Sequence, residues 1–190
     1  MSSILNGKHI QVSVFGQSHS AAIGAVIDGL PAGFRVDEKE VAAFMARRAP
    51  GNAKFATSRK EADAPVVLSG LLDGVTCGAP LGVMIQNTNT RSGDYSNLRT
   101  TPRPSHSDYA AAVRYNGFND IAGGGHFSGR LTAPLVFAGA VCMQILKQKG
   151  IDIRAHIYSV GDVCDTPYDP VQILSLIHIS EPTRPISISY

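Results

Sequence analysis

The segment FGQSHS, residues 15–20, places a histidine directly after an apolar stretch that ends at Phe15-Gly16. At a strand end, between a glycine and two serines, the His19 ring can face a ligand, and an imidazole can donate a proton near neutral pH. His19 is therefore a candidate general acid. The alternative is a hydrogen-bonded surface histidine in a turn, which this motif alone does not exclude.

A second histidine, His106, lies in the sequence PRPSHSD. Two prolines fix the backbone around Arg103, so the His106 side chain is positioned with little entropy left to lose. With Asp108 nearby, the imidazole is a candidate acid or base tuned by a carboxylate. The alternative is that Ser107 or Asp108 is the N-cap of a helix that begins at Tyr109. Both interpretations can hold together.

A glycine-rich segment, AGGGHFSGRLTAP at residues 122–134, precedes a predicted helix. Glycines let backbone N–H groups approach a phosphate closely, and the positive end of a helix dipole favours the phosphate charge. The segment is not a Walker loop, because no Gly-Lys-Ser/Thr follows, and it lacks the third glycine of a dinucleotide fingerprint at Ser128. It predicts a site for a phosphate-bearing cofactor, with a glycine turn of purely steric role as the alternative.

Basic residues in and after a predicted helix are candidate anion ligands. Guanidinium groups bind phosphate and carboxylate with two parallel hydrogen bonds, which suits a doubly anionic small molecule. A solvated basic face is the alternative. The residues concerned are Arg47, Arg48, Lys54, Arg59 and Lys60.

The composition limits the classes of function. Seventeen Lys and Arg against fifteen Asp and Glu give a formal net charge of +2, too balanced to predict a nucleic-acid or membrane partner. The three cysteines lie far apart without a CxxC pair, so we expect neither disulfides nor a metal site, and a reducing cytoplasm is the simplest location. No basic leader precedes an apolar run and no stretch approaches about eighteen apolar residues, so secretion and membrane insertion are not expected.

Apolar residues that alternate with polar ones predict the strands that must position these segments. Strands are expected at residues 10–14 and 23–27, whose hairpin-like spacing favours antiparallel pairing, and again at 65–70 and 81–87. Further alternation predicts a strand at 151–157.

Capping signals predict two helices. Asp37, with Glu40 three residues on, opens a helix that ends at Arg48, and a second helix begins near Ser128 and ends at Gly150. Strands in pairs with intervening helices indicate an α+β or layered α/β domain, and 190 residues suffice for one domain or part of one. Polar connections without a clean period occupy residues 51–63 and 87–108.

Five segments, taken in order, resemble the chorismate synthase family over about the first 170 residues. FGQSHSAAIGAVIDGLPAG is similar to the family's first signature, FGESHG followed by a strand and DG-P-G. GGGHFSGRLTAP is similar to its glycine-rich signature, in the version with His-Phe-Ser in place of Arg-Ser-Ser. The other similar segments are RRAPGNAKFATSRKEAD, NTNTRSGDYS and PRPSHSDYAAAVRYNGFND.

The resemblance implies a reduced-flavin-dependent lyase that removes phosphate from 5-enolpyruvylshikimate 3-phosphate by anti-1,4-elimination, the step that ends the shikimate pathway toward aromatic amino acids. It implies that His19 protonates the leaving phosphate and that His106 acts on the reduced flavin. It also implies that Arg48 and Lys54 bind the substrate, or NADPH in members that reduce their own flavin. The residues implied to contact FMN are His126, Phe127 and Ser128.

The sequence departs from the family pattern at several positions. Gln17 and Ser20 replace an acidic residue and a glycine of the first signature, and Ser105 replaces a glycine before His106. Ala122 and Lys54 stand where arginines are common, so one anion contact is lost and another lacks the bidentate fork. These changes bear on the fine geometry of the site.

The resemblance also sets the expected domain organisation. We expect residues 1–173 to form a partial domain of the family's α+β fold, a layered β-α-β sandwich that is incomplete in this chain, and the full-length protein to be a cytoplasmic homotetramer. Residues 174–190 stop resembling the family and are expected to be a non-native or disordered tail.

Two other classes of function are weighed against the lyase. The chain could be an inactive fragment, or a phosphate- or flavin-binding module, that keeps the glycine segment without turnover. An ordinary nucleotide-binding oxidoreductase would carry an acidic residue roughly twenty positions after the glycines to hold a ribose. Residues 140–150 hold lysines instead, so this class is the least favoured.

Overall fold

The computed structural model describes residues 3–49, 63–88, 92–153, 155 and 157–164. The chain divides into two units, Met1–Lys149 and Gly150–Tyr190, each of which is taken by itself below. Every candidate site residue that the structure describes belongs to the first unit.

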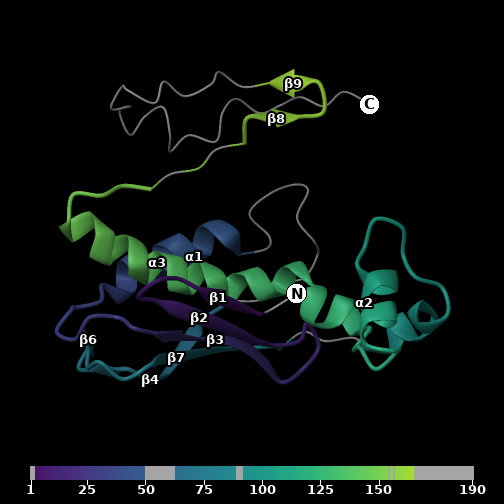
Figure 1. Ribbon diagram of the computed structural model, residues 1–190, viewed down its shortest axis with the longest axis horizontal. Helices are drawn as coiled ribbons and strands as arrows, with labels where there is room; N and C mark the ends of the chain where they lie inside the picture. The colour runs from purple at the N-terminus through teal and green to yellow at the C-terminus, as the bar shows by residue number, and fades with distance from the viewer. Residues whose placement is uncertain (1–2, 50–62, 89–91, 154, 156, 165–190) are drawn as a thin grey trace. The chain divides into compact units, whose positions relative to one another are not determined.

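Five antiparallel strands form the main sheet, in the order β1-β2-β3-β7-β4 (Figure 1). The four strands predicted for this unit are confirmed, and the first two pair antiparallel, as their spacing predicted. The short β1, β5 and β6 were not predicted, because two or three residues give no usable period. The strands are β1 (Ile4–Asn6), β2 (Gln11–Gly16), β3 (Ala22–Asp28), β4 (Pro65–Ser69), β5 (Leu71–Leu72), β6 (Val75–Thr76) and β7 (Leu81–Gln86).

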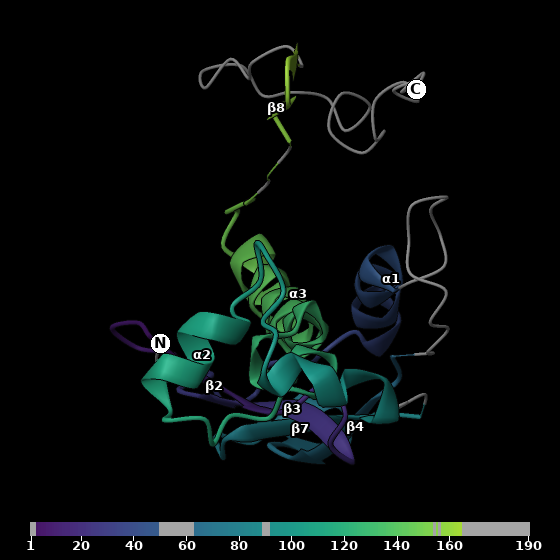
Figure 2. The same ribbon diagram turned by 90° about the vertical axis from the view of Figure 1, so that its right-hand side faces the viewer.

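Helices α1 and α3 lie on one face of this sheet (Figures 1 and 2). Helix α1 begins as predicted, because the Asp37 carboxylate accepts hydrogen bonds from the backbone N–H groups of Lys39 (2.9 Å) and Glu40 (3.0 Å). The helical elements are α1 (Glu38–Arg48), α2 (Asp108–Arg114) and α3 (Thr132–Gln148), with 3-10 turns η1 (Ser92–Arg99), η2 (Ala122–Phe127) and η3 (Gly129–Leu131).

The core lies between the sheet and α3. Alternate residues of β3 point to the helix side and pair with alternate residues of β7, so that one face of both strands is fully buried. The opposing side chains of α3 are equally buried, and this packing fixes the sheet edge from which the site loops emerge. The buried residues of this contact are Ile23, Ala25, Ile27, Leu81, Val83, Ile85, Phe137, Ala138 and Val141.

The strand predicted at 151–157 is wrong. The residues of this segment that the structure describes carry no strand, and Ile151, Ile153 and Ile157 are exposed. Alternation favours a strand only where a neighbouring strand completes its hydrogen bonds, and the described residues supply none here. The strands described in the second unit are the short hairpin of β8 (Ser159–Val160) and β9 (Val163–Cys164).

One helical stretch in the described residues, Ala122–Gln148, is long and apolar enough to cross a membrane by length and composition. From the sequence we expected no stretch of this length and apolar character. However, its first part has non-helical backbone at Gly123, Gly124 and Gly125, and its second part, α3, packs into the core. A buried core helix accounts for its apolar character.

Candidate active site

The glycine segment and the two candidate histidines meet in η2. Gly123, Gly124 and Gly125 have φ of 59°, 86° and 56°, in the left-handed region that favours glycine. A Cβ on Gly123 would overlap the imidazole of His19, and a Cβ on Gly124 would lie 2.9 Å from Cε1 and Nε2 of His106. Two residues remote in sequence are thus packed against successive glycines.

The surroundings of His19 hold its ring at the edge of this loop. The neighbouring Ser18 is buried, and its backbone N–H donates to the carbonyl of Gly125 (3.0 Å). The ring of Tyr95, from η1, meets the His19 imidazole edge-on at 5.2 Å between centroids. Within the described part of the chain, the buried Nδ1 of His19 has no hydrogen-bond partner. An orphaned polar atom of this kind marks a place where a bound group would complete the site.

His106 belongs to a local cluster built around one carboxylate. Asp108 is buried, and its Oδ1 lies 2.6 Å from Nδ1 of His106. The same carboxylate accepts from Nε (2.8 Å) and Nη2 (2.9 Å) of Arg103 and from its backbone N–H (3.1 Å). Hydrogen bonds from the Arg103 guanidinium hold the pKa of the Asp108 carboxyl well below its usual range, against the opposing effect of burial. Ionised Asp108 therefore orients His106 through Nδ1, while Nε2 lies toward Gly124 and 3.3 Å from Nη2 of Arg103.

Two interpretations were open for this segment, a His106 tuned by Asp108 and an N-cap at Ser107 or Asp108. They hold together only in part. Ser107 occupies the N-cap position of α2, but its side chain makes no capping hydrogen bond. Asp108 is the first residue of the helix, and its side chain serves the Arg103 and His106 cluster instead.

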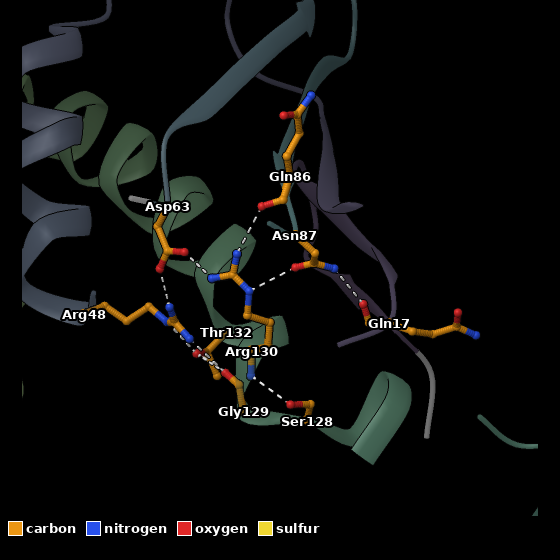
Figure 3. Close-up of polar contacts among 9 residues, drawn as sticks. All are labelled: Gln17, Arg48, Asp63, Gln86, Asn87, Ser128, Gly129, Arg130 and Thr132. Carbon is orange, nitrogen blue, oxygen red and sulfur yellow. Dashed lines mark hydrogen bonds and ion pairs between the residues drawn. The ribbon is translucent and has the colours of Figure 1, made fainter. Parts of the chain in front are cut away.

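A second buried carboxylate, Asp63, bridges two arginines (Figure 3). Its Oδ2 accepts from Nη1 of Arg48 at 2.6 Å, and its Oδ1 accepts from Nη1 of Arg130. Arg48 also donates to Oγ1 of Thr132 (3.0 Å) and to the carbonyl of Gly129 (3.3 Å). The cluster ties the C-terminus of α1 to the start of α3 and places two positive charges around one negative charge.

The three residues expected to contact a flavin continue the glycine loop, and each already has a structural contact. His126 lies with Nδ1 2.7 Å from the carbonyl of Gly16 and with Nε2 beside the Ser3 hydroxyl. The Phe127 ring packs beside that of Tyr115, with 6.1 Å between the ring centroids and 48° between the ring planes. Ser128 is the N-cap of η3, where its Oγ accepts from the backbone N–H of Arg130 (3.3 Å).

The structure brings most of the predicted residues together and adds others. His19 and His106 pack against the glycine loop, which continues into residues 126–128. Arg48, the last residue of α1, contacts Gly129 and Thr132 at the start of α3 instead. Lys54, Arg59 and Lys60 lie outside the described residues. Sequence reasoning missed the contacts that position these groups, because their partners are remote in the chain. The missed residues are Asp63, Asn87, Tyr95 and Arg130.

This arrangement is suited to proton transfer beside an anion. It combines two imidazoles, one of them oriented by a carboxylate, with a pair of arginines that shares one negative charge. The glycines serve sterically, since they make room for the imidazoles. A steric role of the glycine segment is therefore shown, and phosphate binding by the same segment stays a prediction.

A family model described as chorismate synthase matches residues 10–186. The chain belongs to the chorismate synthase family. The chorismate synthase of Thermococcus kodakarensis is 43% identical over 171 residues, which cover 90% of this chain and 48% of the relative. Those of Helicobacter hepaticus (43%; 86% and 45% covered) and Chitinophaga pinensis (45%; 84% and 47% covered) are similar to the same extent.

The fold agrees with this family. A crystal structure of chorismate synthase matches with a TM-score of 0.55 and 26% identity, over 76% of this chain and 36% of that one. The predicted α+β class is confirmed, and in the described residues a five-stranded antiparallel sheet is covered on one face by α1 and α3. The chain spans about half the length of the curated relatives it matches. The family's lyase reaction belongs to aromatic amino acid biosynthesis and requires a reduced flavin.

Proposed function

We propose that this chain carries the acid–base and anion-binding part of a chorismate synthase site, at which 5-enolpyruvylshikimate 3-phosphate loses phosphate to give chorismate. The observation that carries the proposal is the packing of His19 and His106 against successive glycines of one loop. Family membership supplies the reaction, and the geometry supplies residues with the chemistry that it needs.

In this anti-1,4-elimination the C–O bond to phosphate breaks and its electron pair leaves with the phosphate. The hydrogen on the opposite face leaves as a proton, and the electron pair of its C–H bond forms the new double bond as the existing one shifts, without net oxidation. His19 gives a proton to the departing phosphate. His106 holds a proton next to the flavin, with Asp108 fixing its ring through Nδ1 at 2.6 Å. Arg48 binds the anionic substrate, or NADPH, and Lys54 adds a second positive charge.

The described residues fit a bound polar group beside this loop, since Nδ1 of His19 is buried there without a hydrogen-bond partner among them. Reduced FMN, when bound, supplies electron density that eases the loss of phosphate. Phe127 offers an aromatic edge to it. His126 and Ser128 hold the loop backbone in place for that contact.

The proposal extends to the setting of the full-length protein. We expect reduced FMN as the cofactor, NADPH as reductant in a bifunctional enzyme, a homotetramer as the assembly and the cytoplasm as the location, without a nucleic-acid or membrane partner. The non-native tail at 174–190 is also a proposal, and the family match, which extends to residue 186, argues against it. Reading the source gene beyond codon 173 decides between a family continuation and a foreign sequence.

The experiment is an anaerobic assay of the purified chain with reduced FMN and 5-enolpyruvylshikimate 3-phosphate, with phosphate release as the readout. Release should fall by about a hundredfold or more in His19→Ala and in His106→Ala. His9→Ala, an exposed histidine at the N-terminal side of β2, is the matched control and should keep full activity. Equal release by all four proteins would overturn the roles of the two histidines.

The span of about half of each relative favours a second candidate, a flavin- or phosphate-binding module without turnover. This candidate predicts that reduced FMN binds the chain tightly while no phosphate is released. Absence of both binding and release would exclude the lyase and the module together for this chain.

A further inference from the structure

The side chain of Asn87, directly after β7, uses its whole amide group to join two parts of the site. Its Nδ2 donates to the carbonyl of Gln17 (3.0 Å), and its Oδ1 accepts from Nε of Arg130 (3.1 Å) (Figure 3). The same Nδ2 donates to the carbonyl of Ser20 (2.8 Å). Its backbone N–H donates to the carbonyl of Ala21 (3.0 Å), next to the β3–β7 ladder. The amide is therefore anchored to the sheet while it reaches to both sides.

On one side, Asn87 closes the turn that presents His19. Gln17 and Ser20 flank this histidine, and their carbonyls are the two acceptors of the Asn87 amide. The turn is also held by the Ser20 hydroxyl, which donates to the Gln17 carbonyl (2.9 Å), and by the backbone N–H of Ser18, which donates to the Gly125 carbonyl (3.0 Å). The Asn87 donors add the connection from the turn to the end of β7, so their loss would loosen the turn and let His19 shift relative to Gly123.

On the other side, Asn87 reaches the arginine pair. The Arg130 side chain is 5% exposed, and its guanidinium is bound by Asn87, by Asp63 and by the carbonyl of Gln86 (3.5 Å). Asp63 passes the connection on to Arg48 at 2.6 Å. A continuous series of hydrogen bonds thus runs from the His19 turn to the end of α1.

We propose that Asn87 is a positioning residue that fixes the turn carrying His19 relative to the arginine pair Arg48 and Arg130. The inference rests on the proposed function, in which His19 delivers the proton and Arg48 holds the anion. A proton donor and an anion ligand must keep one spacing for the proton to reach the leaving oxygen. The amide of Asn87 sets this spacing from the rigid end of β7.

The chemistry of the position explains why an amide is needed. Two acceptors, the carbonyls of Gln17 and Ser20, and one donor, Nε of Arg130, surround the side chain of residue 87. A carboxamide has two N–H donors and one oxygen, so it satisfies all three. An aspartate has the same shape, but it would point a second oxygen at the carbonyls of Gln17 and Ser20 while it kept the bond to Arg130. Asn87→Asp therefore removes the His19 side of the connection and pulls Arg130 away from Asp63.

The test uses NMR on the isotope-labelled full chain. A residue at one end of the hydrogen-bond series is substituted, and the signals of the side chain at the other end, His19 or Arg48, are measured. In Asn87→Asp, the His19 ring signals should shift and solvent exchange of the Arg48 Nε–H should rise about tenfold, although Arg48 does not touch residue 87. In Asp63→Asn, the His19 ring signals should shift as well. Asn6→Asp, the same change on the exposed strand β1, should leave both signals in place.

Several outcomes decide the proposal. If each variant alters only the groups that it touches, Asn87 is a local structural residue and the inference is overturned. If Asn87→Asp fails to fold, Asn87→Ser, which keeps one donor and one acceptor, is the second variant. It must still shift the Arg48 Nε–H signal, and an unchanged signal would also overturn the inference. Neither readout needs turnover, so a chain that releases no phosphate refutes the function while these spectra still decide the positioning role.

Discussion

Two buried carboxylates, Asp63 and Asp108, each contact two basic side chains, yet the clusters differ in what they can do. Asp63 lies between two arginines, both permanently charged and both bound to further groups of the protein. Asp108 lies between Arg103 and a titratable imidazole, His106, whose other nitrogen lies toward the glycine loop. The first cluster fixes positive charge in place, and the second leaves a group that can give or take a proton.

The clusters also differ in how the chain builds them. Arg103, His106 and Asp108 lie within six consecutive residues, whereas Asp63 and Arg130 are 67 residues apart. The Asp63 cluster therefore forms only when α1, the end of β7 and the start of α3 have come together (Figure 3). We expect the stability of the whole unit to depend more on Asp63 and proton transfer to depend more on Asp108.

The largest expected effect is that of Asp63→Ala. Removing the carboxylate leaves two guanidinium groups facing each other in a buried site, which should lower the free energy of unfolding by about 3–5 kcal/mol. Urea denaturation measures this loss. Lys147→Met is the control, because it breaks the exposed pair of Lys147 with Glu40 (3.4 Å) and should cost about 0.5 kcal/mol or less. Similar losses in both variants would contradict the special role of the buried carboxylate.

Asp108→Asn should have a smaller effect that depends on pH. The folded-state pKa of Asp108 is depressed, so its contribution to stability is full above the ordinary pKa of an aspartate and is lost as the pH falls toward the folded value. The variant should be less stable than the parent by about 2 kcal/mol at pH 7. The gap should narrow steadily as the pH is lowered from about 5 to 2.

Denaturation curves at several pH values give this difference directly. Glu38→Gln removes an exposed carboxylate in the first turn of α1 and serves as the control, with a small gap at every pH. A gap between Asp108→Asn and the parent that stays constant below pH 5 would show that the Arg103 hydrogen bonds do not depend on the Asp108 charge.

The smallest expected effect is the difference in stability loss between two glycine-to-alanine variants, one inside and one outside the glycine loop. This difference separates the cost of backbone strain from the cost of a steric contact. Gly124 and Gly33 have nearly equal φ, 86° and 85°, but a Cβ meets the His106 ring at Gly124 and nothing within 4 Å at Gly33. Gly33→Ala should cost about 1 kcal/mol from its conformation alone. Gly124→Ala should cost about 1 kcal/mol more and should shift the His106 ring signals by NMR. Equal losses with unmoved His106 signals would mean that the imidazole does not need this space.

The predictions that the structure confirms are those in which the deciding contacts are local and several residues long. The β2–β3 pair, the Asp37 cap of α1 and the pairing of His106 with Asp108 depend on residues a few positions apart, and period and capping rules describe such contacts. The strand expected at 151–157 failed because alternation says nothing about whether a partner strand is present.

The remote contacts were beyond sequence rules. Nothing in the residues around Asp63 or Arg130 indicates that they bond to each other, because that contact depends on how the chain before β4 meets the start of α3. The glycine segment was recognised, but its steric role could not be separated from phosphate binding until the imidazoles packed against it were known. Resemblance to a family supplied the roles of His19 and Arg48, which physical reasoning on the residues left open.

The three successive left-handed glycines have a consequence for the order in which the molecule opens. An unfolded chain explores more backbone conformations at glycine than at any other residue, so ordering Gly123, Gly124 and Gly125 carries an unusually high entropic penalty. The favourable energy that offsets this penalty comes from the core under α3 and from the side chains of His19 and His106, which pack against the loop. The loop should therefore exchange its amide hydrogens with solvent well before the sheet does, and a group bound against the loop should slow this exchange before it slows that of the sheet.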